Sequence, residues 1–290
     1  MSRIAYVNGR YVPLAKAEVH VEDRGFQFAD SVYEVCEVWC RDIVDMTRHL
    51  DRLTRSLKEL SMDWPVTRKA LEMIMREVIT RNRVHTGLVY LQVSRGAARR
   101  DFQFPAPGTP TTLVVTSRAT LPATRRAAGE NGIKAITVPD IRWQRVDIKT
   151  TGMTAQVLAK EAAIRAGAKE AFMVDGEGRV TEGSSATAWI VNADGTLITR
   201  PKDMGILPGV TRHAIMDYAA AHGIKVEERP FTVEEARDAR EAFITSASAT
   251  VVAVVQIDDK VLGNGAPGSV ASGLRDHFHE GVERLPVEQY

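Results

Sequence analysis

The side chain most able to do chemistry in this chain is the amine of Lys149, which ends the segment Arg-Trp-Gln-Arg-Val-Asp-Ile-Lys (142–149). A carboxylate, Glu182, follows in Val-Thr-Glu-Gly-Ser-Ser (180–185), and Gly-Ile-Leu-Pro-Gly-Val-Thr-Arg (205–212) then opens a predicted helix. An amine forms a Schiff base with an aldehyde, a carboxylate pairs with a protonated ring nitrogen, and a helix N-terminus binds phosphate. The three segments therefore predict a pyridoxal phosphate site attached at Lys149.

The lysine and the carboxylate would have distinct roles in such a site. Once a substrate amine displaces it, Lys149 can move a proton between the substrate carbon and the cofactor's C4′, as general base and then general acid. Its amine must be neutral to do so, which partial burial beside other cations favours. Glu182 would keep the pyridine nitrogen protonated, so that the ring withdraws electrons from the developing carbanion. The alternative for Glu182 is a structural cap near the following glycine.

Three segments are candidates for the phosphate contacts. The helix that begins at Val210 and Thr211 offers backbone N–H groups, its positive dipole end and the threonine hydroxyl. A small-residue turn that contains Ser246 and Ala247 follows a predicted strand and offers further donors. Arg52, in His-Leu-Asp-Arg-Leu, offers a bidentate positive charge. The alternative for Arg52 is an exposed ion pair on a helix.

Together these segments resemble the class IV (fold type IV) pyridoxal phosphate-dependent aminotransferases, and the likeness is closest to the D-amino acid transaminases. The resemblance extends from Asp-Arg-Gly-Phe-Gln-Phe-Ala-Asp (23–30) to Val-Gln-Ile-Asp (255–258). It implies a two-domain α+β enzyme with the cofactor site between the domains. It also implies a homodimer in which residues of a second subunit complete the site, and it implies that Leu207 packs on the cofactor ring.

The resemblance is weaker at the substrate carboxylate. D-amino acid transaminases bind this group with a tyrosine, matched here by Tyr33, and with an Arg-x-His pair. Arg100 matches the arginine, but Phe102 stands where the family has histidine. A phenyl ring cannot donate a hydrogen bond, and losing one bond to a charged group costs about 1.5–3 kcal/mol. Arg99 or Arg24 could compensate, or Arg99 and Arg100 could be a solvated pair.

The implied activity is a ping-pong transamination through Lys149 from a D-amino acid to a 2-oxo acid such as 2-oxoglutarate or pyruvate. Phe102 favours an alternative, an (R)-selective amine transaminase. A branched-chain L-aminotransferase is disfavoured, because the segments at 23–28 and 142–149 look like those of the D-specific group. A lyase like aminodeoxychorismate lyase would use the same cofactor without an amino acceptor. The complete set of site residues argues against a binding protein without turnover.

Composition excludes several other classes. Hydrophobic residues make up 44% and charged residues 26%, which is ordinary for a soluble globular protein. The net charge of +1 predicts no nucleic-acid partner. No apolar stretch approaches the roughly 20 residues of a membrane helix, and no signal peptide is visible. We therefore expect a cytoplasmic protein whose partners are a small-molecule amino donor and a 2-oxo acid, with no membrane partner.

Neither the cysteines nor the histidines predict a metal site or a cross-link. Cys36 and Cys40 lie on one predicted strand, roughly 13 Å apart at about 3.3 Å per residue, which is too far for a disulfide. We expect both to be free thiols in or near a core. His277 and His279 are two apart on a predicted helix and therefore point to different sides. No metal site is expected.

The pattern along the chain predicts two domains. We expect a small N-terminal α/β domain over 1–120 and a larger C-terminal domain over 121–290 that carries Lys149. The boundary is placed at a linker at the start of the polar stretch 118–130. Beyond it strands and helices mix without regular alternation, and the last helix is predicted over 269–285. This irregular order favours the α+β class.

Overall fold

The computed structural model describes residues 3–120 and 122–288, without the side chains of 122–126. It divides into two compact units. The first unit contains the chain up to Thr120, the segment Ile148–Gly152 and the segment that begins at Glu283, and the second contains Leu121–Asp147 and Met153–Val282. The predicted boundary residue, 121, lies outside the described residues.

The assignment of Lys149 to the second domain was wrong. Residues 148–152 belong to the first unit because their backbone pairs with a strand of its sheet. The α/β label for the N-terminal domain also needs correction, because all strand pairs described in its sheet are antiparallel. The chain as a whole has the predicted α+β character.

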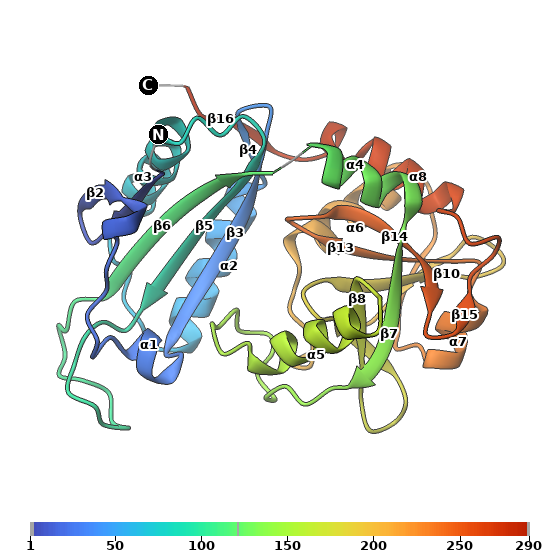
Figure 1. Ribbon diagram of the computed structural model, residues 1–290, viewed down its shortest axis with the longest axis horizontal. Coiled ribbons are helices and arrows are strands. Elements are labelled where there is room, and N and C mark those ends of the chain that lie inside the picture. Colours follow the sequence, from blue (N-terminus) through green and yellow to red (C-terminus); the bar gives the residue numbers. More distant parts are fainter. Residues whose placement is uncertain (1–2, 121, 289–290) are drawn as a thin grey trace. The chain divides into compact units, whose positions relative to one another are not determined.

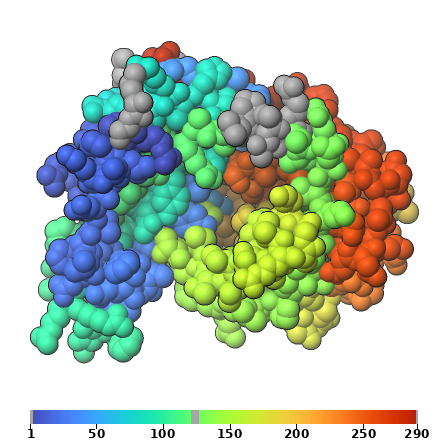
Figure 2. Space-filling model, viewed as in Figure 1, coloured from blue at the N-terminus to red at the C-terminus, as the bar shows by residue number. Residues whose placement is uncertain are grey.

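The first unit is a seven-stranded sheet with the order β16-β4-β3-β5-β6-β1-β2 (Figure 1). Its strands are β1 (Ile4–Val7), β2 (Arg10–Pro13), β3 (Ser31–Trp39), β4 (Asp42–Val44), β5 (Gly87–Ser94), β6 (Thr112–Ala119) and β16 (Arg284–Pro286). Its helices are a 3-10 turn (Leu14–Lys16), α1 (Arg24–Phe28), α2 (Met46–Glu59) and α3 (Arg68–Arg81). The loop between β5 and β6 extends away from the sheet (Figure 2).

Helices α2 and α3 cover one face of this sheet. In α2 the buried residues recur at helical spacing and include His49, Leu50, Leu53 and Leu57. The side chains of Val32, Cys36 and Val38, alternate residues of β3, lie in the same core. Because β-strand side chains alternate between faces, Glu34 shares the helix-covered face and Tyr33 lies on the opposite one.

The second unit contains a nine-stranded sheet with the order β12-β11-β10-β13-β14-β7-β8-β9, with β15 paired to β14. The pairs β11–β12, β14–β7 and β7–β8 are parallel. Its strands are β7 (Ile133–Pro139), β8 (Glu170–Val174), β9 (Val180–Gly183), β10 (Thr187–Val191), β11 (Leu197–Thr199), β12 (Val226–Glu228), β13 (Glu241–Ser246), β14 (Thr250–Ile257) and β15 (Lys260–Val261). Its helices are α4 (Pro122–Asn131), α5 (Thr154–Arg165), α6 (Val210–Ala221), α7 (Val233–Asp238), α8 (Ser269–Asp276) and a 3-10 turn (Phe278–Glu280).

Both faces of the second sheet are covered, and the sequence of its central strands reflects this. Every residue of β10 is buried. Trp189 stacks on Phe243 with ring centroids 5.6 Å apart, on the face that carries Arg212 of α6. Ala236 of α7 packs in the core that contains Ile244 on the other face. A strand buried on both faces reads as a continuous apolar run, as Thr-Ala-Trp-Ile-Val does.

Two predicted elements differ from the structure. The stretch expected to begin with a linker forms α4, and the expected long final helix is three pieces, namely α8, a 3-10 turn and strand β16. Strand β16 pairs with β4 of the first unit, so sheet pairing replaces helical continuation there. Both cysteines are free thiols; Cys36 is buried as expected, whereas Cys40 is exposed.

Candidate functional site

Lys149 is held by backbone pairing at the edge of β3. The N–H of Tyr33 donates to the carbonyl of Lys149 at 3.0 Å, and the N–H of Thr151 donates to the carbonyl of Ser31 at 3.1 Å. Val32 and Thr150 form an antiparallel bridge between these two bonds. The loop that carries Lys149 thus pairs with β3 like a short extra strand. This pairing fixes the backbone of Lys149.

The lysine amine lies over an aromatic surface. Its Nζ is 4.2 Å from the centroid of the Tyr33 ring, and the rings of Tyr33 and Tyr90 are 5.6 Å apart. The Tyr90 hydroxyl donates to Gln92 Oε1 at 2.7 Å. Burial, reinforced by Tyr33, raises the pKa of Tyr90 to about 12, so this phenol stays neutral.

A buried carboxylate holds Arg52 on the other face of the same strand. Arg52 donates from Nε to Glu34 Oε1 and from Nη2 to Glu34 Oε2, both at 2.7 Å. His49 Nδ1 lies 2.7 Å from the same Oε2. The Glu34 side chain is fully buried and that of Arg52 is 9% exposed. The exposed-pair alternative for Arg52 is therefore excluded.

Glu34, His49 and Arg52 shift one another's pKa values. Burial alone would raise the pKa of Glu34, but Arg52 and then His49 lower it to about 2. Burial lowers the pKa of His49, with smaller contributions from the charges of Arg52 and Lys149, although Glu34 opposes the change. Glu34 raises the pKa of Arg52 against the effect of burial. At neutral pH the group is an ionised Arg–Glu pair with a neutral histidine.

Arg100 and Phe102 come together on the exposed β5–β6 loop. The guanidinium of Arg100 lies 4.5 Å from the centroid of the Phe28 ring, and the Phe28 and Phe102 rings are 5.8 Å apart. Phe102 is 87% exposed. Both side chains thus gather at the end of α1, whereas Tyr33 lies on the sheet.

In the second unit, Glu182 is bound to an arginine that the sequence reasoning gave no role. Arg142 donates from Nη1 to Glu182 Oε2, and from Nε and Nη2 to Asp140 at 2.9 and 2.7 Å. The Glu182 side chain is 7% exposed. It lies in β9 and is not the cap of a helix, so the capping alternative is not supported.

The two candidate phosphate-binding segments of the second unit are neighbours. Helix α6 packs against β13, and its N-cap residue Gly209 has no side-chain capping hydrogen bond. A Cβ on Gly209 would lie 3.0 Å from the hydroxyl of Thr187, whose strand partner is Thr245. The turn that begins with Ser246 directly follows this residue. The structure therefore brings the start of α6 close to the serine turn.

The side chains of these two segments differ in how far they are buried. Val210 and Thr211 are buried, whereas Ser246 and Ala247 are half-buried. The Ser246 hydroxyl accepts from the Ala249 N–H at 3.3 Å and lies 3.2 Å from the Ser248 hydroxyl. Just before α6, Ile206 is fully buried, whereas the adjacent Leu207 is half-buried.

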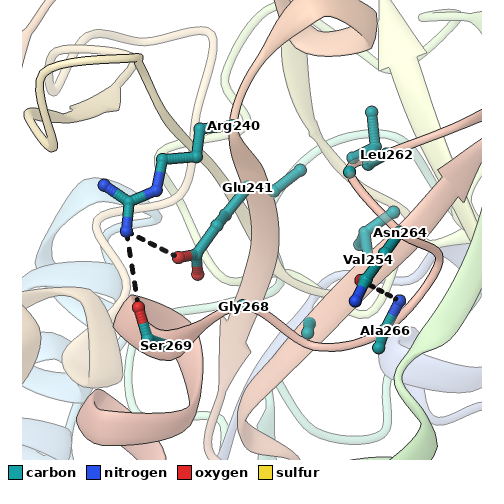
Figure 3. Close-up of a pocket in the computed structure, with 11 residues that line it drawn as sticks. Arg240, Glu241, Val254, Leu262, Asn264, Ala266, Gly268 and Ser269 are labelled. Atoms are coloured by element: carbon teal, nitrogen blue, oxygen red, sulfur yellow. Dashed lines mark hydrogen bonds and ion pairs between the residues drawn. The ribbon is translucent and has the colours of Figure 1, made fainter.

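A cavity of about 160 Å³ in the second unit lies apart from all these residues. Its carboxylate, Glu241, accepts from the N–H groups of Val270 and Ala271 and so caps α8. Arg240 reaches both Glu241 and Ser269 at its mouth (Figure 3). This carboxylate is occupied in holding a helix end, and none of the predicted site residues lines the cavity.

Comparison with known proteins decides between the possible families. The family model described as Amino-transferase class IV matches residues 31–257. The chain belongs to the class IV aminotransferases. A D-alanine aminotransferase of Staphylococcus aureus is 35% identical over 279 residues, which cover 96% of this chain and 97% of that protein. A D-alanine aminotransferase of Bacillus licheniformis is 34% identical over 95% of each chain.

Solved structures agree with this assignment. A T.th. branched-chain amino acid aminotransferase, complexed with N-(5'-phosphopyridoxyl)-L-glutamate, has a TM-score of 0.87 at 28% identity, and the match covers 97% of this chain and 94% of that one. The Escherichia coli branched-chain enzyme has the same TM-score at 24% identity, which shows the shared fold. This class IV aminotransferase is an enzyme that uses pyridoxal 5'-phosphate.

The residues of this aminotransferase fit that cofactor. An amine, a buried carboxylate, an uncapped helix start and a guanidinium are the donor set that an aldehyde, a pyridine nitrogen and a phosphate require. The bare backbone at Gly209 also lets the Thr187 hydroxyl approach the helix start. Among the described residues, no group of three or more His, Cys, Asp or Glu side chains could hold a metal ion. None of the described helices is long and apolar enough to cross a membrane.

Sequence reasoning missed Glu34, His49, Asp140 and the role of Arg142. For Glu34 a signal existed, since an acid at a core-facing position of an apolar strand needs a buried cation. His49 and Arg52 stand three apart in α2, a spacing that places both near one helix face. Asp140 and Arg142 had no comparable signal, because their meeting with Glu182 depends on how β7 and β9 are placed in the sheet.

The dependence of stability on pH tests the Glu34 pair. Because the folded pKa of Glu34, about 2, lies below its ordinary 4.5, its contribution is complete above that ordinary value and is lost as pH falls toward 2. We expect Glu34→Gln to lower the free energy of unfolding by about 3–5 kcal/mol, since it leaves Arg52 buried without its carboxylate. Urea unfolding from about pH 6 to about pH 3.5 should give a shallower pH slope for the variant than for the wild type.

The matched control for this measurement is Glu77→Gln. Glu77 pairs with Arg81 on an exposed face of α3, so its loss should change stability by at most about 1 kcal/mol. A pH slope for Glu34→Gln equal to that of the wild type would contradict the ionised buried pair.

Proposed function

We propose that this aminotransferase moves an amino group from a D-amino acid to a 2-oxo acid by a ping-pong mechanism. The observation that carries the proposal is the match to D-alanine aminotransferases at 35% identity over 96% of the chain. The branched-chain enzymes share the fold at lower identity, 28% for the T.th. protein. The geometry around Lys149 supports the transfer chemistry itself.

Lys149 holds the cofactor and moves the proton. Bound pyridoxal phosphate supplies an aldehyde for a covalent link and a ring that withdraws electrons. Lys149 Nζ would provide the amine of that link and, once freed by a substrate amine, would take the proton from the substrate's α-carbon. The Tyr33 ring, 4.2 Å away, stabilises the amine once it carries that proton. The backbone bonds to β3 keep the base in place through both tasks.

The other residues hold and polarise the cofactor. Glu182 would accept a charge-assisted hydrogen bond from the protonated pyridine nitrogen and so keep the proton on the ring. Val210, Thr211, Ser246 and Ala247 would offer backbone N–H groups and hydroxyls to the phosphate, and Arg52 would add a positive charge. Leu207, whose side chain is half-buried, would pack on the ring.

The substrate carboxylate meets fewer donors than in the family pattern. Tyr33 and Arg100 are its proposed partners, and Phe102 occupies the place of the histidine donor. The proposal is that D-amino acids bind with a weaker carboxylate contact and that the site also tolerates apolar groups. Phe102 is the observation that favours the second candidate, an (R)-selective amine transaminase.

We also propose that the enzyme is a homodimer. The end of α1 and the β5–β6 loop expose three phenylalanines, Phe26, Phe102 and Phe104, at 75%, 87% and 62%. Clustered exposed aromatic side chains mark interaction surfaces. A second copy of the chain is the proposed occupant, and it fits the resemblance noted from the sequence. Location in the cytoplasm remains a prediction from the sequence.

Borohydride trapping tests the covalent link. Reduction of the pyridoxal phosphate-loaded protein should label Lys149 alone, and Lys149→Ala should abolish labelling and lower transamination at least about 100-fold. Lys169 is an exposed lysine, so Lys169→Ala is the control and should behave like the wild type. D-alanine and D-glutamate, each mixed with the loaded enzyme without acceptor, should bleach the cofactor's visible band. Bleaching by L-leucine alone, or by (R)-1-phenylethylamine alone, would overturn the D-amino acid assignment.

Substitution of Phe102 tests the weakened carboxylate contact. Phe102→His restores a donor, so the KM for D-alanine should fall by about 10- to 100-fold. The rate with (R)-1-phenylethylamine, which has no carboxylate, should not rise. Val261→His places the same imidazole on exposed strand β15, away from the proposed substrate and dimer residues, and is the control. Equal effects of the two variants would show that position 102 does not meet the carboxylate.

Sedimentation equilibrium tests the homodimer. The mass should be twice the chain mass of 31.9 kDa at micromolar concentration. Phe26→Ser combined with Phe104→Ser should weaken the association by about tenfold or more, because it removes buried aromatic area. Val261→Ser, an exposed apolar residue of β15, should leave the mass unchanged. A monomeric wild type would refute the dimer.

A further inference from the structure

Arg142 binds two carboxylates at once in the second unit. Its side chain is only 3% exposed, and it donates to both oxygens of Asp140 and, through Nη1, to Glu182. The Asp140 side chain is 12% exposed. Since one guanidinium spans both acids, two negative charges lie close together in a poorly solvated place, and Arg142 is the cation between them.

The same guanidinium also contacts a backbone that leads to the phosphate-binding helix. Arg142 Nη2 donates to the carbonyl of Gly205 at 3.1 Å and to Thr181 Oγ1 at 3.2 Å. The Thr181 hydroxyl in turn donates to Asp140 Oδ2 at 2.6 Å. Gly205 begins the segment that continues through Leu207 to the start of α6. One side chain therefore links β9, which carries Glu182, to this segment.

The ionisation of the network agrees with its geometry. Burial alone would raise the pKa of Asp140, but the hydrogen bonds of Arg142 and Thr181 and the charge of Arg142 lower it. Burial would lower the pKa of Arg142, but Asp140 and Glu182 raise it. At neutral pH the arginine is a cation, so that one positive charge faces two acids. Removing it would leave two like charges to repel one another at short range.

We propose that Arg142 is the positioning residue of the pyridine-nitrogen site: it keeps Glu182 ionised and oriented, and it holds Gly205 so that the ring and phosphate contacts keep a fixed spacing. The inference rests on the proposed role of Glu182. Arg142 does not need to touch the cofactor. It acts through the carboxylate, in the way that outer residues orient the side chains that bind a metal ion.

Replacement of the arginine should change the cofactor's protonation as well as its affinity. In Arg142→Gln the two acids face each other without a cation, so a proton binds between them and Glu182 loses charge. A neutral Glu182 no longer holds a proton on the pyridine nitrogen. The variant also loses the hydrogen bond from Arg142 to the Gly205 carbonyl, so the segment that carries Leu207 is held less firmly.

The experiment uses full-length enzyme and pyridoxal phosphate labelled with ¹⁵N in the ring. The ¹⁵N chemical shift should report a protonated ring nitrogen in the wild type and a neutral one in Arg142→Gln. Equilibrium dialysis of the apoenzyme should show cofactor affinity lowered by about 10- to 100-fold, the range seen when orienting residues are removed from metal sites. Arg145→Gln, an arginine of the same segment that pairs with Asp147, is the matched control and should keep both values.

A second variant covers the case in which Arg142→Gln does not fold. Arg142→Lys keeps the positive charge but loses the paired N–H donors of the guanidinium. The ring nitrogen should therefore stay protonated, while cofactor affinity falls by about tenfold. A thermal melt identifies a merely structural role: lower stability with an unchanged ¹⁵N shift in Arg142→Gln overturns the inference. Wild-type affinity in either variant also overturns it.

Failure of the proposed function would look different from failure of this inference. If wild-type enzyme is not labelled at Lys149 by borohydride, or if its ring nitrogen is neutral although cofactor is bound, the proposed roles of Lys149 and Glu182 fail. If the wild type shows both properties and Arg142→Gln retains them, only the role of Arg142 fails.

Discussion

The backbone pairing between β3 and residues 148–151 is the constraint on which the chemistry of this aminotransferase depends. The bond from the Tyr33 N–H to the Lys149 carbonyl places the lysine amine over the tyrosine ring. A strand has a side-chain period of two, so a shift of one residue in this pairing would turn the amine to the helix-covered face, among apolar groups. Lys149 is therefore positioned by main-chain hydrogen bonds, which do not depend on the conformation of its side chain.

Each unit contains a buried carboxylate that is bound to an arginine. Glu34 holds Arg52, and Glu182 shares Arg142 with Asp140. A buried ion pair adds little net stability compared with apolar packing, yet loss of one partner costs about 3–5 kcal/mol, because the other charge stays buried. Such pairs give fixed charge at a fixed place, which an enzyme that binds a charged cofactor needs. The residues of each ion-pair network are consequently coupled, and the effects of single substitutions within one network will not add.

The sequence predicted the chemistry of this enzyme better than its architecture. The lysine, the glutamate and the helix start are local patterns, so Lys149, Glu182 and Val210 could be proposed as site residues without knowledge of the fold. Membership of Lys149 in the first unit could not be found, because it depends on pairing with β3, more than a hundred residues earlier in the chain. The final helix failed for a similar reason: Arg284–Pro286 pair with β4, and this distant partner outweighs local helical preference. Asp140 and Arg142 meet Glu182 only once the sheet has formed.

The charged side chains of Arg52 and Glu182, proposed for cofactor binding, are buried, whereas Phe102, proposed for substrate choice, is exposed. The two groups therefore differ in how much a substitution affects stability. Arg52, Glu34 and Glu182 are buried, so substitution there costs stability along with function. Phe102 is 87% exposed on a loop that extends from the sheet, where most substitutions change stability by at most about 0.5 kcal/mol. A histidine-to-phenylalanine exchange at such a position can alter carboxylate binding by about 1.5–3 kcal/mol and leave folding nearly untouched. The departure from the family pattern therefore occurs where the fold constrains the sequence least, and the cofactor set stays complete.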